Sequence, residues 1–240
     1  MLADSEHVDE LRALGLDDPA RWEELLAGER SGLGRGRTGT LELAGGRRVF
    51  LKKMLRGGLA GPLWRNRFPG TSRLVANLRL PLDVASRGVP TPAPVALLIV
   101  SGPPLFYRAW IAFDVVDGAR DLAACLRVRD GALDPVPAAM RLVRDMHEQG
   151  LEHRDLNLGN ILITARDGAL PEAIVIDLDR ARLHAGPLST PLRLRSLRRL
   201  ERSYEKLIGP FAERRAWYAH YAAGEPELLA GLLTSQRGQV

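Results

Sequence analysis

Residues His153 to Asn160 carry the side chains most suited to chemistry. They read His-Arg-Asp-Leu-Asn-Leu-Gly-Asn and run directly into the apolar residues 161–163. On a loop that leads into a strand, Asp155 and Asn160 can point one polar group at a hydroxyl and the other at a metal ion. Phosphoryl transfer needs this combination, because its catalysis comes from orienting the attacking oxygen and from holding Mg²⁺ on the phosphates. The segment therefore predicts a phosphoryl-transfer site.

The same segment fits the kinase catalytic-loop pattern HRDLxxxN at every fixed position. A second acid follows, since the predicted strand 174–176 ends at Asp177. Two short strands on either side of a turn would place Asp177 beside Asn160. Carboxylate and amide oxygens are ligands that Mg²⁺ takes when it also binds phosphates. We therefore expect Asn160 and Asp177 to be metal ligands, and we interpret His153 and Arg154 as supports of the loop.

A glycine-rich turn precedes a predicted strand that ends in lysine at residues 49–52. Glycine lets backbone amides approach phosphate oxygens closely. The candidate nucleotide contacts in this turn are Gly34, Arg35 and Gly36. Lys52 is the candidate for the α- and β-phosphates of ATP. Lys53 would point to the other face of the strand, so the choice between the two lysines depends on the register.

The next predicted helix covers residues 71–80 and is interrupted by Pro81. A kinase needs an acid on this helix to pair with the strand lysine. Asn77 occupies the place where glutamate is expected, and an amide cannot neutralise an ammonium group. Further on, the segment from Phe113 to Val116 would join two lobes. The backbone groups that we expect to meet adenine belong to Phe113, Val115 and Val116.

The remaining elements are predicted from caps and apolar spacing. The segment 134–150 has Asp134 as a cap, Pro135 in the first turn and Gly150 at the end, and its His147 is interpreted as a core or capping residue. The other predicted helices cover 5–28, 192–207, 211–221 and 226–233, and the other predicted strands cover 95–100 and 107–116. No APE signature follows Asp177. A small molecule, sugar or lipid is therefore favoured over a peptide as acceptor.

Composition indicates a globular chain, with 45% hydrophobic and 26% charged residues among 240. Cys125 is the single cysteine, which excludes an internal disulfide and favours a reducing compartment. No apolar run is long enough to span a bilayer, and the acidic amino terminus does not resemble a secretory signal. We therefore expect a cytoplasmic protein, with peripheral contact to a membrane left open.

Arginines crowd residues 180–202, a segment that holds few acids. Such a face would suit a polyanionic substrate or an anionic membrane surface, and a solvated basic helix is the alternative interpretation. Nucleic acid is not expected, because no recognition motif accompanies the charge. The predicted substrate contacts are Arg56, Arg180, Arg198 and Arg202.

Several of these segments together resemble the bacterial lipopolysaccharide core kinases of the 3-deoxy-D-manno-octulosonic acid (Kdo) type. They are residues 51–59, 88–92, 153–160, 176–180 and 197–207. The resemblance implies ATP-dependent phosphorylation of a sugar hydroxyl, on Kdo or heptose, in the inner core of a lipid A-core or Kdo-containing glycolipid. It implies Asp155 as catalytic base, Lys52 on the ATP phosphates, and Asn160 with Asp177 as Mg²⁺ ligands. Two departures are Leu178, where relatives carry an aromatic residue, and Asn77, where they carry glutamate.

The resemblance also implies the fold. We expect an α+β, two-lobed protein-kinase-like fold with a small antiparallel-sheet N-lobe and a mostly helical C-lobe. The predicted regions are accessory helices at 1–28, an N-lobe at 29–116 and a C-lobe at 117–240. Alternative functions are a small-molecule phosphotransferase or protein kinase of the same superfamily, and a nucleotide-binding protein whose catalysis has decayed. The basic tail argues against the cationic acceptors that antibiotic and choline-like kinases bind.

Overall fold

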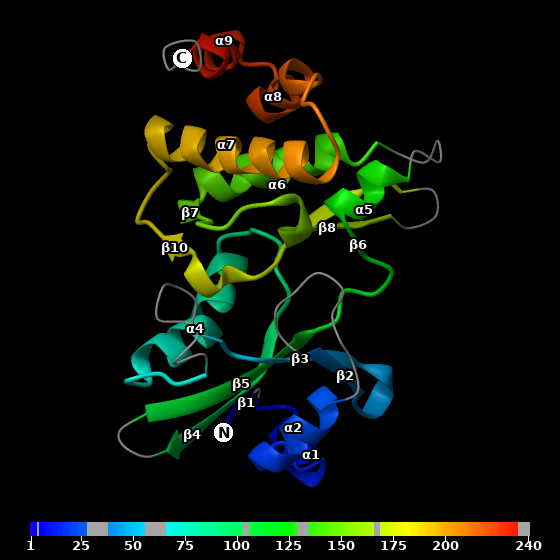
Figure 1. The fold of residues 1–240 in the computed structure, drawn as a ribbon, viewed down its shortest axis with the longest axis vertical. Coiled ribbons are helices and arrows are strands. Elements are labelled where there is room, and N and C mark those ends of the chain that lie inside the picture. The colour runs from blue at the N-terminus through cyan, green and yellow to red at the C-terminus, as the bar shows by residue number, and fades with distance from the viewer. Residues whose placement is uncertain are drawn as a thin grey trace. The chain divides into compact units, whose positions relative to one another are not determined.

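The computed structural model describes residues 1–3, 5–27, 38–55, 66–102, 106–128, 134–165 and 169–234 (Figure 1). The chain forms two compact units. Unit 1 comprises Met1–Asp83 and Pro92–Val115, and unit 2 comprises Val84–Thr91 and Val116–Val240. The three regions expected from the sequence stay a prediction.

Unit 1 contains an antiparallel sheet with the strand order β1-β4-β5-β3-β2. These strands are β1 (Leu2–Ala3), β2 (Thr38–Glu42), β3 (Arg48–Lys53), β4 (Pro94–Gly102) and β5 (Phe106–Asp114). The short 3₁₀ turn η1 (Ala44–Gly46) joins β2 to β3, and Gly45 and Gly46 have φ angles of 76° and 81°, which favour glycine. Strands β2 and β3 therefore form a hairpin that turns at these two glycines.

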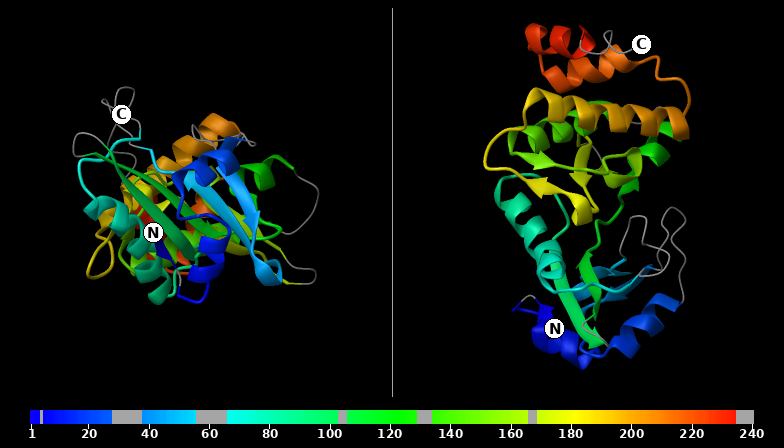
Figure 2. Two further views of the ribbon diagram at one scale, coloured as in Figure 1. Left: turned by 90° about the horizontal axis from the view of Figure 1, so that it is seen from below. Right: turned by 60° about the vertical axis from the view of Figure 1, so that its left-hand side comes forward.

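Two helices, α1 (Val8–Ala13) and α2 (Pro19–Ala27), cover one face of this sheet (Figure 2). Leu11, Trp22 and Leu26 pack in one buried cluster with apolar residues of β3, β4 and β5. The Trp22 indole nitrogen donates to the carbonyl of Leu16 at 2.8 Å. Contact with β2 is so close that a Cβ on Gly39 would lie 2.7 Å from a backbone oxygen of α2. These helices therefore stabilise the sheet by packing against this one face.

The other face of the sheet packs against α4 (Ser72–Ser86), whose Leu74 lies in a cluster with Met54 and Ile111. The predicted end of this helix at Pro81 is wrong, because α4 continues to Ser86 with Pro81 in its interior. Proline inside a helix costs about 3 kcal/mol. Here Pro81 and Val84 are themselves buried, and burial of this apolar side offsets the cost.

Unit 2 is mostly helical, with two small antiparallel sheets of order β6-β8-β9 and β10-β7. Its helices are α5 (Leu122–Arg127), α6 (Val136–Glu148), α7 (Thr190–Leu207), α8 (Arg214–Ala222) and α9 (Pro226–Thr234). Its strands are β6 (Arg120–Asp121), β7 (Leu151–Glu152), β8 (Ile161–Thr164), β9 (Glu172–Val175) and β10 (Arg182–Leu183). Two 3₁₀ turns lie in the candidate site segments. The turn η2 (Leu158–Asn160) ends the segment from His153 to Asn160, and η3 (Leu178–Arg180) directly follows Asp177.

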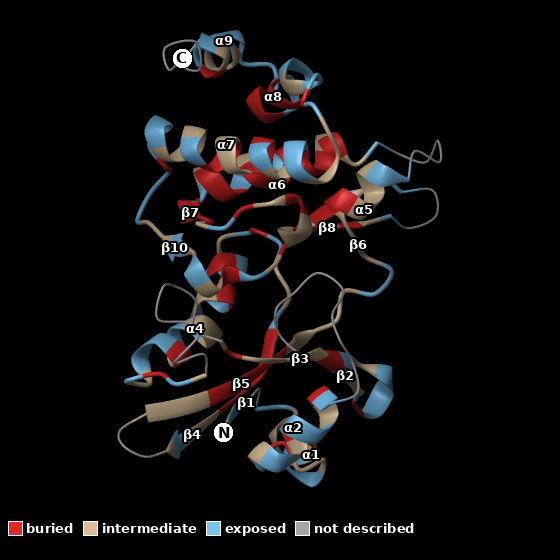
Figure 3. Cartoon of the chain, in the orientation of Figure 1, coloured by how far each residue is buried: buried red, intermediate tan, exposed pale blue. Residues whose placement is uncertain are grey.

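Helix α6 forms the centre of unit 2 and buries most of one side (Figure 3). His147 on this side is fully buried, and its Nδ1 lies 2.8 Å from the hydroxyl of Tyr221 on α8. Glu148 accepts from Arg193 of α7 at 2.7 Å. His147 is thus a core residue, as predicted.

Among the described residues, no helix is both long enough and apolar enough to cross a membrane.

The buried His147 predicts a loss of stability in acid. Burial lowers the pKa of His147 to about 3, and the charge of Arg193 adds to this, against 6.5 for an exposed histidine. Between these values the unfolded chain binds a proton that the folded chain does not, so the free energy of unfolding falls as the pH falls below 6.5. At pH 5 this loss amounts to about 2 kcal/mol.

Urea denaturation at pH 7.5 and pH 5 measures this loss. His147→Gln removes the titrating group, so its stability will fall by about 2 kcal/mol less than that of the wild type over this interval. His220→Gln, at an exposed position on α8, serves as the control and will keep the wild-type dependence. An equal pH dependence in His147→Gln and wild type would contradict the argument.

Candidate active site

The loop between β7 and β8 is held by the ring of His153, which is buried. Its Nε2 donates to the carbonyl of Ile176 at 3.0 Å, and its Nδ1 accepts from the amide of Asp155 at 3.3 Å. These two contacts require the neutral imidazole with its proton on Nε2. Burial lowers the pKa of His153, although the Ile176 carbonyl and two nearby acids act against it. His153 therefore stays neutral and fixes the loop to the segment that follows β9.

Asp155 lies at an exposed position of this loop, and its backbone carbonyl organises the residues that follow. The carbonyl accepts from Nδ2 of Asn157 at 2.8 Å and from Nδ2 of Asn160 at 2.9 Å. No described residue donates a hydrogen bond to the Asp155 carboxylate. Because the amide nitrogen of Asn160 is engaged, its Oδ1 is the atom left to meet a cation. The loop thus presents one carboxylate and one amide oxygen.

Asp177 follows β9 and stands close to Asn160, because Ile161 pairs with Val175 and the Ile176 amide donates to the Asn160 carbonyl at 3.0 Å. Asp177 has φ 59° and ψ 57°, the left-handed conformation. A non-glycine residue in this region stores roughly 1–2 kcal/mol of strain, and such strain clusters at functional sites. The hairpin therefore places next to each other, along the backbone, the two residues that the sequence predicts as metal ligands.

In unit 1, the two neighbouring lysines of β3 point to opposite faces of the sheet. Lys53 forms an ion pair with Glu23 of α2, and its Nζ lies 5.3 Å from the centre of the Trp110 ring. Lys52 points to the opposite face, where its half-buried Nζ lies 5.6 Å from the centre of the Phe113 ring. This is the face that α4 and Asn77 share. Lys52 is therefore the lysine that remains as a candidate for phosphate binding.

Comparison with known proteins identifies the family of the chain. A family model described as the lipopolysaccharide kinase (Kdo/WaaP) family matches residues 21–221. The chain belongs to this family. It is 34% identical over 199 residues to a 3-deoxy-D-manno-octulosonic acid kinase of Xylella fastidiosa (strain M12), covering 81% of this chain and 76% of the relative. A kinase of the same name from Xanthomonas axonopodis pv. citri (strain 306) is 33% identical over 213 residues, covering 87% and 81%.

Solved structures show the fold that the family shares. WaaP in complex with acyl carrier protein matches with a TM-score of 0.58 and 21% identity over 98% of this chain and 96% of that one. The Rio2 kinase from Chaetomium thermophilum, in its ADP/Mg²⁺-phosphoaspartate complex, matches with a TM-score of 0.54 and 19% identity over 97% and 78%. The predicted α+β, protein-kinase-like fold is confirmed. This lipopolysaccharide kinase is an ATP-dependent phosphotransferase with an alcohol group as acceptor.

The donor atoms of the lipopolysaccharide kinase fit Mg²⁺ held partly by a nucleotide. Asn160 and Asp177 offer oxygen ligands, which Mg²⁺ prefers, and too few of them for a site made of protein alone. Within the described ranges, no three His, Cys, Asp or Glu side chains gather in a way that could hold a metal ion. The arrangement therefore suits an ion that takes its other ligands from phosphates and water.

A buried acid beside the catalytic loop was not predicted from the sequence. Glu152 of β7 is buried and accepts from Arg154 at 3.3 Å and from Nε2 of His184 at 3.2 Å. Burial alone would raise the pKa of Glu152, but the hydrogen bonds from His184 and Arg154 together outweigh it and lower the pKa. Glu152 is therefore a charged anchor that holds Arg154 at the start of the loop.

The structure describes some of the predicted nucleotide contacts and not others. The amide of Val115 donates to the carbonyl of Arg48 at 2.9 Å, so only its carbonyl is left to meet a base. Phe113 is the last but one residue of β5, and the carbonyl of Val116 accepts from the amide of Ala119 at 3.3 Å. The residues Gly34, Arg35 and Gly36, and the predicted substrate contact Arg56, lie outside the described residues.

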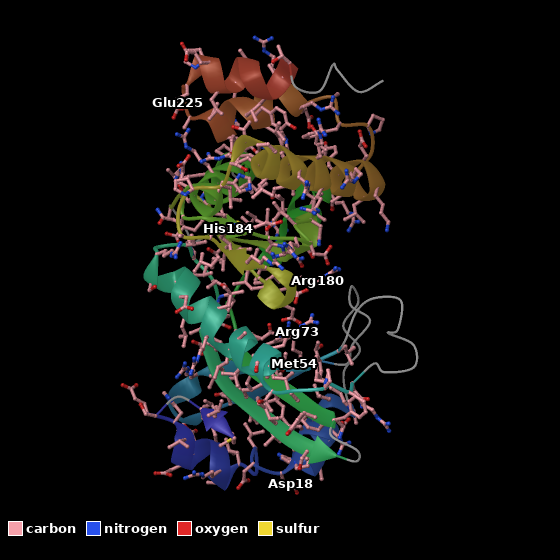
Figure 4. All side chains as sticks on the ribbon, turned by 90° about the vertical axis from the view of Figure 1, so that its left-hand side faces the viewer. Asp18, Met54, Arg73, Arg180, His184 and Glu225 are labelled. Carbon is pink, nitrogen blue, oxygen red and sulfur yellow. The ribbon has the colours of Figure 1, made fainter. Side chains whose placement is uncertain are left out.

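The basic residues near the carboxyl end separate into two groups. Arg193 faces inward, where it donates to Glu148 at 2.7 Å and to the carbonyl of Leu188 at 2.8 Å, so it contributes to packing. Arg180 is exposed on η3 (Figure 4). Arg202 is exposed and Arg198 half-buried, and they lie on the side of α7 opposite its buried leucines. These three predicted substrate contacts remain at the surface.

Proposed function

We propose that the chain transfers the γ-phosphate of ATP to a hydroxyl of Kdo in the inner core of lipopolysaccharide. The observation that supports the chemistry is the loop in which an exposed Asp155 precedes Asn160, with Asp177 just after the strand that pairs with β8. Kdo is favoured over heptose because the curated relatives at 33–34% identity are Kdo kinases. A basic helix α7 suits an anionic acceptor.

Each side chain then has one role. Mg²⁺ bound to the phosphates supplies neutralisation of the charge that develops during transfer. Asn160 and Asp177 would hold it through their side-chain oxygens. The Asp155 carboxylate orients the acceptor hydroxyl and receives its proton as the oxygen attacks phosphorus and the bond to the leaving ADP oxygen breaks. Lys52 binds the α- and β-phosphates, and the backbone of Phe113, Val115 and Val116 meets adenine.

We assign these roles to three regions: supporting helices at 1–28, a nucleotide-binding N-lobe at 29–116 and a catalytic C-lobe at 117–240. Arg56, Arg180, Arg198 and Arg202 are assigned to the anionic acceptor. We also infer that the exposed arginines of α7 meet the anionic cytoplasmic face of the inner membrane. Sedimentation with anionic vesicles tests this inference, because the binding should weaken at high salt.

An acceptor panel with γ-labelled ATP tests the function directly. It comprises a Kdo-containing lipid A precursor, the same glycolipid extended with heptose but already phosphorylated on Kdo, and a generic protein substrate. We expect label on the first glycolipid only. Label on the heptose-extended glycolipid alone would move the acceptor to heptose, and label on the protein alone would refute the proposal.

The metal site predicts an altered Mg²⁺ requirement in one variant. Asp177→Asn keeps a residue type that tolerates the left-handed conformation but removes the charge, so the Mg²⁺ concentration at half-maximal rate will rise roughly 10- to 100-fold. Chelation with EDTA will abolish transfer by the wild type. Asp179→Asn removes a charge two residues away and will leave the Mg²⁺ dependence unchanged. A normal Mg²⁺ dependence in Asp177→Asn would exclude Asp177 as a ligand.

A further inference from the structure

Helix α7 carries three arginines whose charges no acid neutralises directly. Arg195, Arg199 and Arg202 recur at helical spacing, on the side opposite the buried Leu197 and Leu200. None of the three forms a hydrogen bond or ion pair with any residue that the structure describes. In contrast, Arg193 on the inner side of the same helix is fully engaged.

Arg199 borders the catalytic loop. Ser203 lies one turn after Arg199 on the same edge of α7, and its Oγ accepts from the amide of Leu158 at 3.1 Å. Leu158 stands between the two catalytic candidates Asp155 and Asn160. Arg199 also interacts electrostatically with Asp155 and with Glu152. Its guanidinium group therefore lies near the place where an acceptor hydroxyl has to sit.

The environment of Arg199 is unfavourable for a lone cation. Burial lowers the pKa of Arg199, and the neighbouring charges of Arg195 and Arg202 lower it further. Glu152 offsets this in part, but its carboxylate already accepts from Arg154 and His184. A half-buried guanidinium group that repels its neighbours and forms no ion pair with an acid among the described residues is stabilised when an anion binds beside it.

We propose that Arg199, flanked by Arg195 and Arg202, binds an acid group of the acceptor and so places the acceptor hydroxyl at Asp155. This inference rests on the proposed function, in which the acceptor sugar is by its name an acid. Arginine binds carboxylate in two-pronged geometry, so one contact fixes both the position and the direction of the sugar. A neutral sugar would leave the three arginines unpaired and would bind weakly.

Kinetics of Arg199→Ala and Arg199→Lys with a Kdo-containing lipid A precursor test the proposal. Loss of a charged hydrogen bond should raise the KM for the glycolipid by roughly 10- to 100-fold in Arg199→Ala, with a smaller rise in Arg199→Lys. The KM for ATP will not change. The wild type should disfavour the carboxyl methyl ester of the same glycolipid by a similar factor, and Arg199→Ala should lose this discrimination.

The control is Arg215→Ala, which removes an exposed arginine of α8 that has no hydrogen bond or ion pair among the described residues. It should behave as wild type. Binding of the glycolipid and of its ester without ATP is measured in parallel by equilibrium dialysis. Arg199-dependent preference for the acid without phosphate transfer would refute the proposed function and keep the binding site. Transfer by the wild type with an unchanged glycolipid KM in Arg199→Ala, or a raised KM for ATP instead, would overturn the binding site.

Discussion

Replacing Asp155 with asparagine will lower kcat for phosphate transfer by about 10²- to 10⁴-fold, the range expected for loss of a general base. The amide keeps the size of the side chain but cannot accept the proton of the attacking hydroxyl. In the wild type, Asp155 is exposed and its carboxylate accepts no hydrogen bond from the described residues, so the substitution should leave the fold unaffected. Initial rates with γ-labelled ATP at saturating acceptor measure the effect.

Two measurements distinguish a loss of catalysis in Asp155→Asn from a loss of folding. Binding of ATP to Asp155→Asn, followed by thermal shift, should match the wild type, because Asp155 is assigned to the hydroxyl and not to the nucleotide. The thermal midpoint without ligand should also be unchanged. A variant that keeps full activity would show that another group receives the proton, and the proposed mechanism would fail at its first step.

The two neighbouring lysines of β3 give a matched pair of variants. Lys52→Met removes the charge assigned to the ATP phosphates, and its kcat/KM should fall by about 10²- to 10³-fold, as when one charge-stabilising donor is lost. Lys53→Met removes the ion pair with Glu23 at the partly exposed α2 surface and the contact of the ammonium group with the Trp110 ring. Pairs of this kind contribute about 0–1 kcal/mol to stability, so its activity should remain near that of the wild type.

Steady-state kinetics with ATP as the varied substrate distinguish the two lysines. The assignment predicts that the ratio of the two kcat/KM values departs from unity by at least about 10². If Lys53→Met were the impaired variant, the lysine assignment would be reversed. Equal impairment of both would indicate that the strand as a whole had been disturbed.

Asn77 has a bearing on the size of the Lys52 effect. It lies on α4, on the face of the sheet to which Lys52 points, in the place where the sequence comparison led us to expect glutamate. Unlike a glutamate, the amide of Asn77 cannot neutralise the ammonium group of Lys52, so no acid at this position competes with the phosphates.

Local pattern was sufficient where an element carries strong caps or a complete motif. The helix around Met140 and the hairpin at Gly45 and Gly46 follow from caps and turn residues. The loop from His153 to Asn160 follows from its motif alone. The register of β3 does not follow from the sequence, because both faces of the strand carry a lysine. Only the ion pair between Lys53 and Glu23 of α2 distinguishes the two faces.

Contacts between distant segments could not be predicted in the same way. Glu152 meets His184 through β7 and β10, which are two residues each and too short to show a strand period. The local cost of Pro81 predicts a helix end, whereas burial along α4 decides the outcome. The sequence does not distinguish Arg199 from the other arginines of the basic tail. The hydrogen bond between Ser203 and Leu158 places this part of α7 beside the loop.

A crystal structure with Mg²⁺ and a non-hydrolysable ATP analogue tests the assigned site as a whole. We expect one metal ion bound by side-chain oxygens of Asn160 and Asp177 and by the phosphates, with Lys52 on the α- and β-phosphates and Asp155 facing the γ-phosphate. A nucleotide whose phosphates contact neither Lys52 nor a metal ion held by Asp177 would contradict it.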